Sequence, residues 1–211
     1  MNRVNRPLAA RFRGAFPALV TPLAPELPEI AFIGRSNVGK SSLINALVGQ
    51  RLARTSATPG KTRSLNVYEI HLGRTRDGPA HPSALYVLDL PGYGYARAAK
   101  SERRAFRALI RATVQRAQVS GIVWLLDLRR DLGEDDRDTG TALVERGVPV
   151  LVALTKCDTV PRSERPAREE AIRDALGMPA DQMVLTSART GDGIPDLRAA
   201  LAALAARAAP A

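Results

Sequence analysis

The sequence predicts an α/β fold of three layers, in which helices cover both faces of a mostly parallel six-stranded sheet. From Glu29 onward, short apolar segments alternate with segments of helical periodicity, and a glycine-rich loop follows the first apolar segment. Strands separated by helices of this length form βαβ units, whose strands lie parallel in one sheet. Such sheets bind ligands at the carboxyl ends of their strands, so the residues that follow each strand are the candidates for chemistry.

The expected elements follow this alternation along the chain. Six segments are rich in branched apolar residues and are expected to be strands: Ile30–Ile33, Leu65–Leu72, Leu85–Leu90, Ile122–Asp127, Val148–Leu154 and Met183–Ser187. Five segments show helical spacing: Lys40–Val48, Ser101–Val119, Glu134–Arg146, Glu164–Leu176 and Ile194–Ala206. The alternation in Leu65–Leu72 is typical of an exposed or edge strand.

The composition fits one basic globular domain. The 211 residues are 45% apolar, and 31 Lys and Arg against 21 Asp and Glu give a net charge of +10. This charge favours association with nucleic acid, although arginine enrichment also arises from genome composition alone. The longest apolar run, Gly121–Leu128, is far shorter than the roughly 18 residues of a membrane span, and one cysteine cannot form an internal disulfide. We expect a cytoplasmic monomer without a membrane partner.

The first 28 residues are expected to form a basic, irregular arm that precedes a single globular domain over 29–211. They contain several prolines, the single acid Glu26, and the arginines Arg3, Arg6, Arg11 and Arg13. Prolines interrupt the apolar stretch Ala15–Ala24, which disfavours a secretory signal. The arginine-rich, acid-poor composition also resembles that of an organellar transit peptide.

A phosphate-binding loop follows the first predicted strand. The segment Gly34-Arg35-Ser36-Asn37-Val38-Gly39-Lys40-Ser41 matches the pattern G-x-x-x-x-G-K-S/T. Its glycines let backbone N–H groups surround a phosphate, and the following helix adds the positive end of its dipole. In this pattern Lys40 reaches the β- and γ-phosphates, and the Ser41 hydroxyl binds Mg²⁺.

Two further segments fit a site for the γ-phosphate and Mg²⁺. Asp89-Leu90-Pro91-Gly92 ends the third predicted strand, where the aspartate can hold Mg²⁺ through water and the Gly92 amide can sense the γ-phosphate. In Thr58-Pro59-Gly60-Lys61-Thr62, a threonine hydroxyl can complete the Mg²⁺ shell when the γ-phosphate is present. An ordinary Pro-Gly turn is the alternative for this stretch.

The last two segments indicate recognition of guanine. In Thr155-Lys156-Cys157-Asp158, the carboxylate of Asp158 can accept hydrogen bonds from guanine N1–H and its 2-amino group, a pair that adenine lacks. The stem of Lys156 would lie across the base, and Thr186-Ser187-Ala188 would place an amide near guanine O6. Five such segments in order, four of them directly after a predicted strand, predict a guanine-nucleotide site.

The motifs GRSNVGKS, TPGKT, DLPGYGYA and TKCD together resemble those of the EngB family, within the translation-factor-related P-loop GTPases. The resemblance runs from Glu29 to the C-terminus and implies a P-loop GTPase fold. It implies a GTP-binding switch in assembly of the large ribosomal subunit, needed for normal cell division and septation. The Mg²⁺ ligands it implies are Ser41 and Thr62, and the catalytic residues are Lys40 and Thr62.

The resemblance also implies a set of nucleotide contacts in five segments of the chain. They are Gly34, Arg35, Ser36, Asn37, Val38, Gly39, Lys40, Ser41, Gly60, Lys61, Thr62, Arg63, Ser64, Asp89, Leu90, Pro91, Gly92, Thr155, Lys156, Cys157, Asp158, Thr186, Ser187 and Ala188. The chain departs from the family at Arg74–Ser83, a longer loop, and at Thr186-Ser187, where the family often has two serines.

The residue after D-x-x-G is Tyr93, where Ras-like GTPases have a glutamine that orients the attacking water. We therefore expect slow hydrolysis of GTP by the isolated protein and acceleration by a partner. Asn37 either holds K⁺ beside the phosphates, as in some related GTPases, or only caps the loop.

A helix that starts between positions 97 and 101 is expected to carry a basic face. Its members recur at spacings of three and four, within an arc of roughly 80°: Arg97, Lys100, Arg104, Arg107 and Arg111. The opposite side should face the sheet and carries Phe106, Leu109, Ile110, Thr113 and Ala117. With only Glu102 near it, the basic face, together with the arginine-rich arm, suggests contacts to RNA phosphates; a solvated helix face is the alternative. The resemblance to the EngB family implies that this RNA belongs to the large ribosomal subunit or its precursor.

Two other functions fit part of the pattern. One is a P-loop enzyme that uses ATP, such as a kinase, which would show no preference for guanine. The other is an RNA-binding module with a vestigial nucleotide site, whose affinity for RNA would not depend on GTP or GDP.

Overall fold

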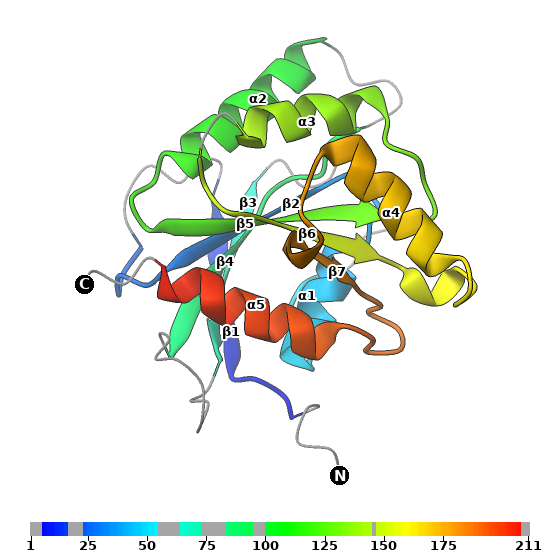
Figure 1. The fold of residues 1–211 in the computed structure, drawn as a ribbon. Coiled ribbons are helices and arrows are strands. Elements are labelled where there is room, and N and C mark those ends of the chain that lie inside the picture. Colours follow the sequence, from blue (N-terminus) through cyan, green and yellow to red (C-terminus); the bar gives the residue numbers. More distant parts are fainter. Residues whose placement is uncertain are drawn as a thin grey trace.

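The computed structural model describes residues 6–16, 23–54, 64–72, 83–94, 100–144 and 147–207. In this part of the chain, a sheet lies between two layers of helices (Figure 1). Its seven strands are β1 (Ala10–Phe16), β2 (Glu29–Gly34), β3 (Leu65–His71), β4 (Ala84–Asp89), β5 (Val119–Asp127), β6 (Val150–Thr155) and β7 (Met183–Leu185). The helices are α1 (Lys40–Val48), α2 (Lys100–Val114), α3 (Glu134–Val144), α4 (Arg165–Leu176) and α5 (Ile194–Ala206).

The strand order is β1-β3-β4-β2-β5-β6-β7. Strands β4, β2, β5, β6 and β7 are parallel neighbours, whereas β3 pairs antiparallel with both β4 and β1. The carboxyl ends of the five parallel strands therefore lie along one edge of the sheet. The predicted three-layer, mostly parallel fold is confirmed.

The central strand β2 is buried on both faces, which explains its uninterrupted apolar sequence. Ile30 and Phe32 pack into the core that α1 and α5 cover, and Ala31 and Ile33 pack into the core under α2, α3 and α4. Alternate side chains of one strand thus hold both helical layers against the sheet. No helix in the described ranges is long and apolar enough to cross a membrane.

The prediction of six strands is wrong by one, because Ala10–Phe16 in the expected irregular arm forms the edge strand β1. Arg11 donates from Nε and Nη2 to the Glu69 carboxylate at 3.0 and 3.1 Å, and Glu69 is only 3% exposed. The expectation that Leu65–Leu72 lies at an edge is also wrong, since β1 covers β3. The basic segment Ala10–Phe16 shows no local signal of a strand, because the acid that pairs with Arg11 lies 58 residues along the chain.

The predicted helix Ser101–Val119 ends earlier than expected, at Val114, and β5 starts at Val119. Arg116 lies in the intervening turn, where its guanidinium binds the buried Glu29 carboxylate with two contacts of 2.6 Å. Ala117 is consequently exposed and does not face the sheet as expected. The Arg116–Glu29 pair fixes the turn at the amino end of β2.

Candidate nucleotide-binding site

The loop between β2 and α1 has the backbone geometry of an anion-binding loop. Asn37 (φ 63°) and Gly39 (φ 106°) adopt left-handed conformations, and Gly39 is the N-cap of α1. This arrangement leaves the first N–H groups of α1 without partners within the helix, so they are available to a phosphate. Gly34 has no room for a side chain, because an added Cβ would lie 2.9 Å from Val38 Cγ1 and 3.0 Å from the Leu125 carbonyl oxygen.

Lys40 and Asp89 meet at the carboxyl edge of the sheet. The Lys40 ammonium binds Asp89 Oδ1, and Asn66 Nδ2 approaches Oδ2 at 3.4 Å. The carboxylate of Asp89 is 3% exposed, and Ser41 follows Lys40 on the first turn of α1. A hydroxyl and a carboxylate are oxygen ligands of the kind that Mg²⁺ prefers, so these residues fit the ion that the sequence predicts.

The D-x-x-G segment lies directly against the phosphate loop. At Gly92 an added Cβ would lie 2.8 Å from Ser36 Oγ and 2.9 Å from Ser36 N. The Ser36 amide donates to the Tyr93 carbonyl at 2.8 Å, and the Tyr93 amide donates to the Gly34 carbonyl at 3.3 Å. Ser36 Oγ is buried and has no hydrogen-bond partner among the described residues. Only glycine allows the chain to approach the loop this closely.

The T-K-x-D segment is tied to the phosphate loop by its first two side chains. Thr155 Oγ1 donates to the Val38 carbonyl at 2.7 Å. Lys156 Nζ donates to the Asn37 carbonyl at 2.7 Å and to Asp127 Oδ2 at 2.9 Å. The segment predicted to read the base and the segment predicted to hold the phosphates therefore form one site.

Asp158 is held as an ionised carboxylate at this edge. Ser187 Oγ donates to its Oδ1 at 2.6 Å, and Arg189 Nε donates to Oδ2 at 2.7 Å. The hydrogen bond from Ser187 is the main cause that lowers the pKa of Asp158; the Arg189 guanidinium lowers it further, against the opposing effect of burial. A carboxylate that stays ionised is the acceptor that guanine N1–H and the 2-amino group require.

Sequence reasoning missed Asp127 and Arg189 in this site. Burial raises the pKa of Asp127, but hydrogen bonds from Arg129 and Lys156 outweigh it and lower the pKa to about 2. Asp127 ends a buried strand, which is the signal that singled out Asp89. Arg189 has no such signal, because its guanidinium is 74% exposed and its contact with Asp158 depends on the fold.

The structure brings the described predicted residues together along this edge, but not all can contact a nucleotide through their side chains. Those of Val38, Leu90, Cys157 and Thr186 are at most 3% exposed, so only their main chains are available. The predicted residues Gly60, Lys61, Thr62 and Arg63, together with Arg97, lie outside the described residues, as does the side chain of Lys100.

Tyr93 does not face the phosphate loop with its hydroxyl. The side chain is buried, and the hydroxyl donates to Asp136 Oδ1 of α3 at 2.8 Å. Burial, followed by the charge of Asp136, raises the pKa of Tyr93. The hydroxyl is thus engaged by α3.

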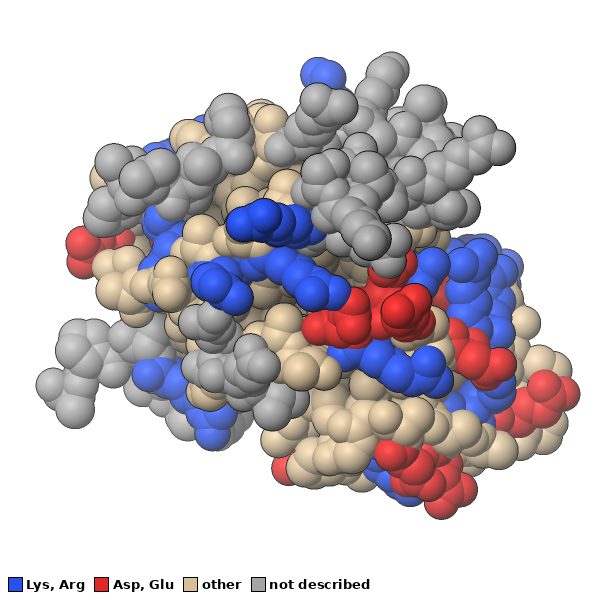
Figure 2. Space-filling view, turned by 90° about the horizontal axis from the view of Figure 1, so that it is seen from above, with Lys and Arg blue, Asp and Glu red and all other residues tan. Residues whose placement is uncertain are grey.

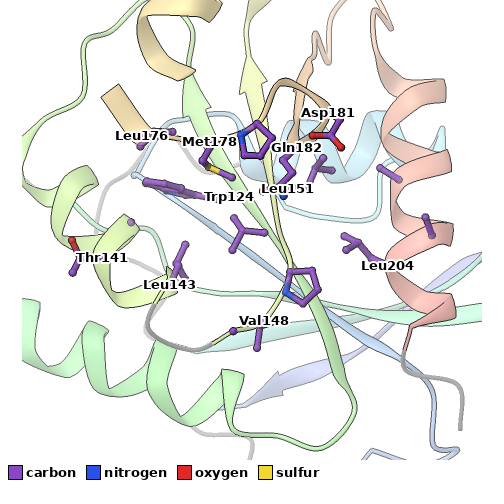
Figure 3. A pocket seen from close by; sticks show the side chains of 18 of the residues that line it. Trp124, Thr141, Leu143, Val148, Leu151, Leu176, Met178, Asp181, Gln182 and Leu204 are labelled. Atoms are coloured by element: carbon purple, nitrogen blue, oxygen red, sulfur yellow. The ribbon is translucent and has the colours of Figure 1, made fainter. Parts of the chain in front are cut away.

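Two hollows in the described part of the chain differ in their position relative to the motifs. One of about 440 Å³ lies beside the phosphate loop, between Arg35, Asn37 and the start of α3. A groove of about 1100 Å³ lies at the amino ends of β6 and β7, lined by side chains that include Trp124, Leu151 and Leu204 (Figure 3). Because the groove is at the opposite ends of the strands, it does not belong to the nucleotide site.

Of the predicted basic face, the side chains of Arg104, Arg107 and Arg111 are described and lie on α2, and the view from above in Figure 2 shows basic and acidic side chains gathered side by side. Arg104, Arg107 and Arg111 are exposed, whereas Ile110 and Thr113 on the opposite side are buried, as expected. Arg107 binds Asp138 of α3, so the expectation of a face with only Glu102 near it is wrong. The sequence pattern of α2 alone could not show this neighbour.

The chain is similar to known GTP-binding proteins over most of its length. A family described as 50S ribosome-binding GTPase matches residues 29–156. A probable GTP-binding protein EngB of Syntrophomonas wolfei is 42% identical over 180 residues, which cover 84% of this chain and 87% of the relative. A protein of the same description from Bacillus subtilis is 39% identical over 170 residues, which cover 79% and 82%.

Solved structures show the same fold. The crystal structure of a probable GTP-binding protein engB has a TM-score of 0.63 at 22% identity, over 83% of this chain and 97% of that chain. Era in complex with MgGDPNP and nucleotides 1506–1542 of 16S ribosomal RNA has a TM-score of 0.64 at 21% identity, over 87% of this chain and 58% of Era. These structures confirm the predicted fold of a P-loop GTPase.

Replacement of Ser187 by alanine is expected to raise the pKa of Asp158 toward its ordinary value. The change removes the strongest hydrogen bond to the carboxylate, whereas Arg189→Ala removes a contact that solvent screens. Carboxyl ¹³C titration by NMR measures both variants, and we expect the larger rise in Ser187→Ala. A rise at least as large in Arg189→Ala would show that the exposed guanidinium holds the carboxylate.

Proposed function

Because the chain belongs to the EngB family of GTP-binding proteins, we propose that it is a GTP-dependent switch in assembly of the large ribosomal subunit. As a member of this family, the chain is a GTPase. The observation that carries the guanine-specific part of the proposal is the buried support of Asp158 by Ser187, together with the tie between Lys156 and the phosphate loop. An ATP-using enzyme has no need of such an acceptor.

The proposed roles follow from position at the sheet edge. Lys40 stabilises charge on the β- and γ-phosphates, and the amides at the start of α1 hold the phosphates. Ser41, Thr62 and Asp89 would hold Mg²⁺, which when bound neutralises charge on the phosphate oxygens. For K⁺, Asn37 is the proposed ligand because its side chain is exposed at the loop; its left-handed backbone equally suits the simpler role of capping.

We infer that hydrolysis is slow in the isolated protein and is stimulated by the partner. The support comes from Tyr93, the residue after Gly92. Its hydroxyl is buried and bonded to Asp136, so Tyr93 does not orient water as a glutamine does at this position. A partner that supplies the missing group, or moves this segment, would accelerate the reaction.

The proposed partner is ribosomal RNA of the large subunit or its precursor, and the proposed location is the cytoplasm. Support comes from the family description and from the exposed arginines of α2, since arginine binds phosphate well. Era, a structural neighbour, is bound to ribosomal RNA in its crystal structure. The proposed need for the protein in cell division and septation would then follow from the supply of ribosomes.

Asp158→Asn is expected to weaken GDP binding by at least about 100-fold and to improve binding of xanthosine diphosphate. Xanthine carries a carbonyl where guanine has its 2-amino group, so the amide of asparagine can donate where the carboxylate accepted. Competition against a fluorescent guanine nucleotide measures both affinities.

The matched control is Asp181→Asn, an exposed aspartate near the amino ends of the strands, which should leave both affinities unchanged. Unaltered preference for GDP in Asp158→Asn would contradict the assignment of the guanine site.

Replacement of both Arg104 and Arg111 by glutamate, which reverses their charge, is expected to weaken binding to large ribosomal subunits at least about tenfold. The loss of two phosphate contacts should also reduce the slope of log affinity against log salt concentration by about two. Sedimentation with subunits in the presence of a GTP analogue measures both quantities.

Arg51→Glu with Arg207→Glu makes the same change of net charge at exposed positions off α2 and serves as the control. Equal losses in the two double variants would show a general effect of charge and no role of the α2 face.

A further inference from the structure

A buried chain of hydrogen bonds passes through the residue that follows Gly92. The Tyr93 hydroxyl donates to Asp136 Oδ1 at 2.8 Å and accepts from Trp124 Nε1 at 2.9 Å. All three residues are buried: Tyr93 is 6% exposed, Asp136 3% and Trp124 2%. Hydrogen bonds shielded from water in this way are costly to break, because the groups left behind remain buried.

The second oxygen of Asp136 reaches the phosphate loop. Asp136 Oδ2 accepts from the Gly133 amide at 2.9 Å and from Arg35 Nη1 at 3.3 Å. Two glycines make room for this guanidinium: an added Cβ would lie 2.9 Å from Arg35 Nε at Gly94, and 3.1 Å from Nη1 at Gly133. We call Arg35, Tyr93, Trp124 and Asp136 the Asp136 cluster.

The cluster fixes both the backbone and the ring of Tyr93. The main chain of Tyr93 is paired with Ser36 and Gly34 of the phosphate loop at 2.8 and 3.3 Å. Its ring packs on Phe106 of α2, with a distance of 5.2 Å between the ring centroids. The segment 92–94 is therefore held at once by the phosphate loop, by α2 and by α3.

The arrangement held in this way suits a site without a γ-phosphate. Lys40, whose role is to bind the β- and γ-phosphates, is paired with Asp89, whose role is to hold Mg²⁺. Gly92, whose amide senses the γ-phosphate, is in contact with Ser36. Lys40 and Asp89, which GTP and Mg²⁺ would use, are thus paired with each other.

We propose that Asp136 is a positioning residue that latches residues 92–94 in the arrangement without γ-phosphate, so that GTP has to release Tyr93 before the Gly92 amide can bind the phosphate. The latch depends on the proposed nucleotide site, whose choice between GDP and GTP it regulates. Since GDP leaves the latch closed and GTP opens it, the latch lowers the affinity for GTP relative to GDP. A weaker latch should favour GTP.

The experiment measures the ratio of the dissociation constants of GDP and a non-hydrolysable GTP analogue. Tyr93→Phe removes one oxygen atom, and Asp136→Asn keeps the size of the side chain. Each variant is expected to shift the ratio toward GTP by about fivefold, the effect of one buried hydrogen bond. In the double variant the shift should not be the product of the two, because both changes open the same latch.

Tyr86→Phe is the matched control, since Tyr86 is also fully buried and donates its hydroxyl to the Pro25 carbonyl at 3.1 Å, away from the phosphate loop. It should leave the ratio unchanged whatever it does to stability. An unchanged ratio in both Tyr93→Phe and Asp136→Asn, or a shift toward GDP, would overturn the latch.

A second measurement needs no nucleotide and separates the latch from the proposed function. In the free protein, amide hydrogen exchange at Ser36, which donates to the Tyr93 carbonyl, should be faster in Tyr93→Phe and Asp136→Asn than in wild type or Tyr86→Phe. Unchanged exchange at Ser36 would overturn the latch. Failure of the wild type to prefer guanine nucleotides would instead overturn the proposed function.

Discussion

Two hydrogen bonds that span more than half of the chain define the site. Thr155 and Lys156 donate to the carbonyls of Val38 and Asn37, which lie 117 and 119 residues earlier. These bonds set the distance between the loop that would hold the phosphates and the carboxylate that would read the base. If they are lost, each motif keeps its local geometry, but a single nucleotide can no longer engage both.

The parallel sheet makes these bonds possible. Strands β2, β5 and β6 are parallel neighbours, so Gly34, Asp127 and Thr155 end at the same edge. Asp127 then serves as the acceptor for Lys156, and the low pKa of its carboxyl keeps it charged. The apolar strands are thus a frame that places polar groups from distant motifs together, as in other sheets of this class.

The central strands and the phosphate loop could be predicted because their signals are local. An apolar run, a glycine pattern and a helical period each occupy a few adjacent residues, and β2, the loop after it and α1 formed as expected. Strand β1 could not be predicted in this way, since Glu69, which pairs with Arg11 of this strand, lies 58 residues away. The same reason hid Arg189 beside Asp158 and Tyr93 on Asp136, whose contacts join separate elements. The sequence favoured a basic face on α2, but only the fold shows that Asp138 pairs with Arg107.

The most direct test of one site that reads both base and phosphates is calorimetric titration of the wild-type protein with GDP and with ADP, in the presence of Mg²⁺. Both ligands offer the same phosphates, so any difference in affinity comes from the base. We predict that GDP binds at least about 1,000-fold more tightly than ADP, because adenine leaves the carboxylate of Asp158 without its two donors. Equal affinities would contradict the account, since the phosphate loop would then act without the base-reading loop to which it is tied.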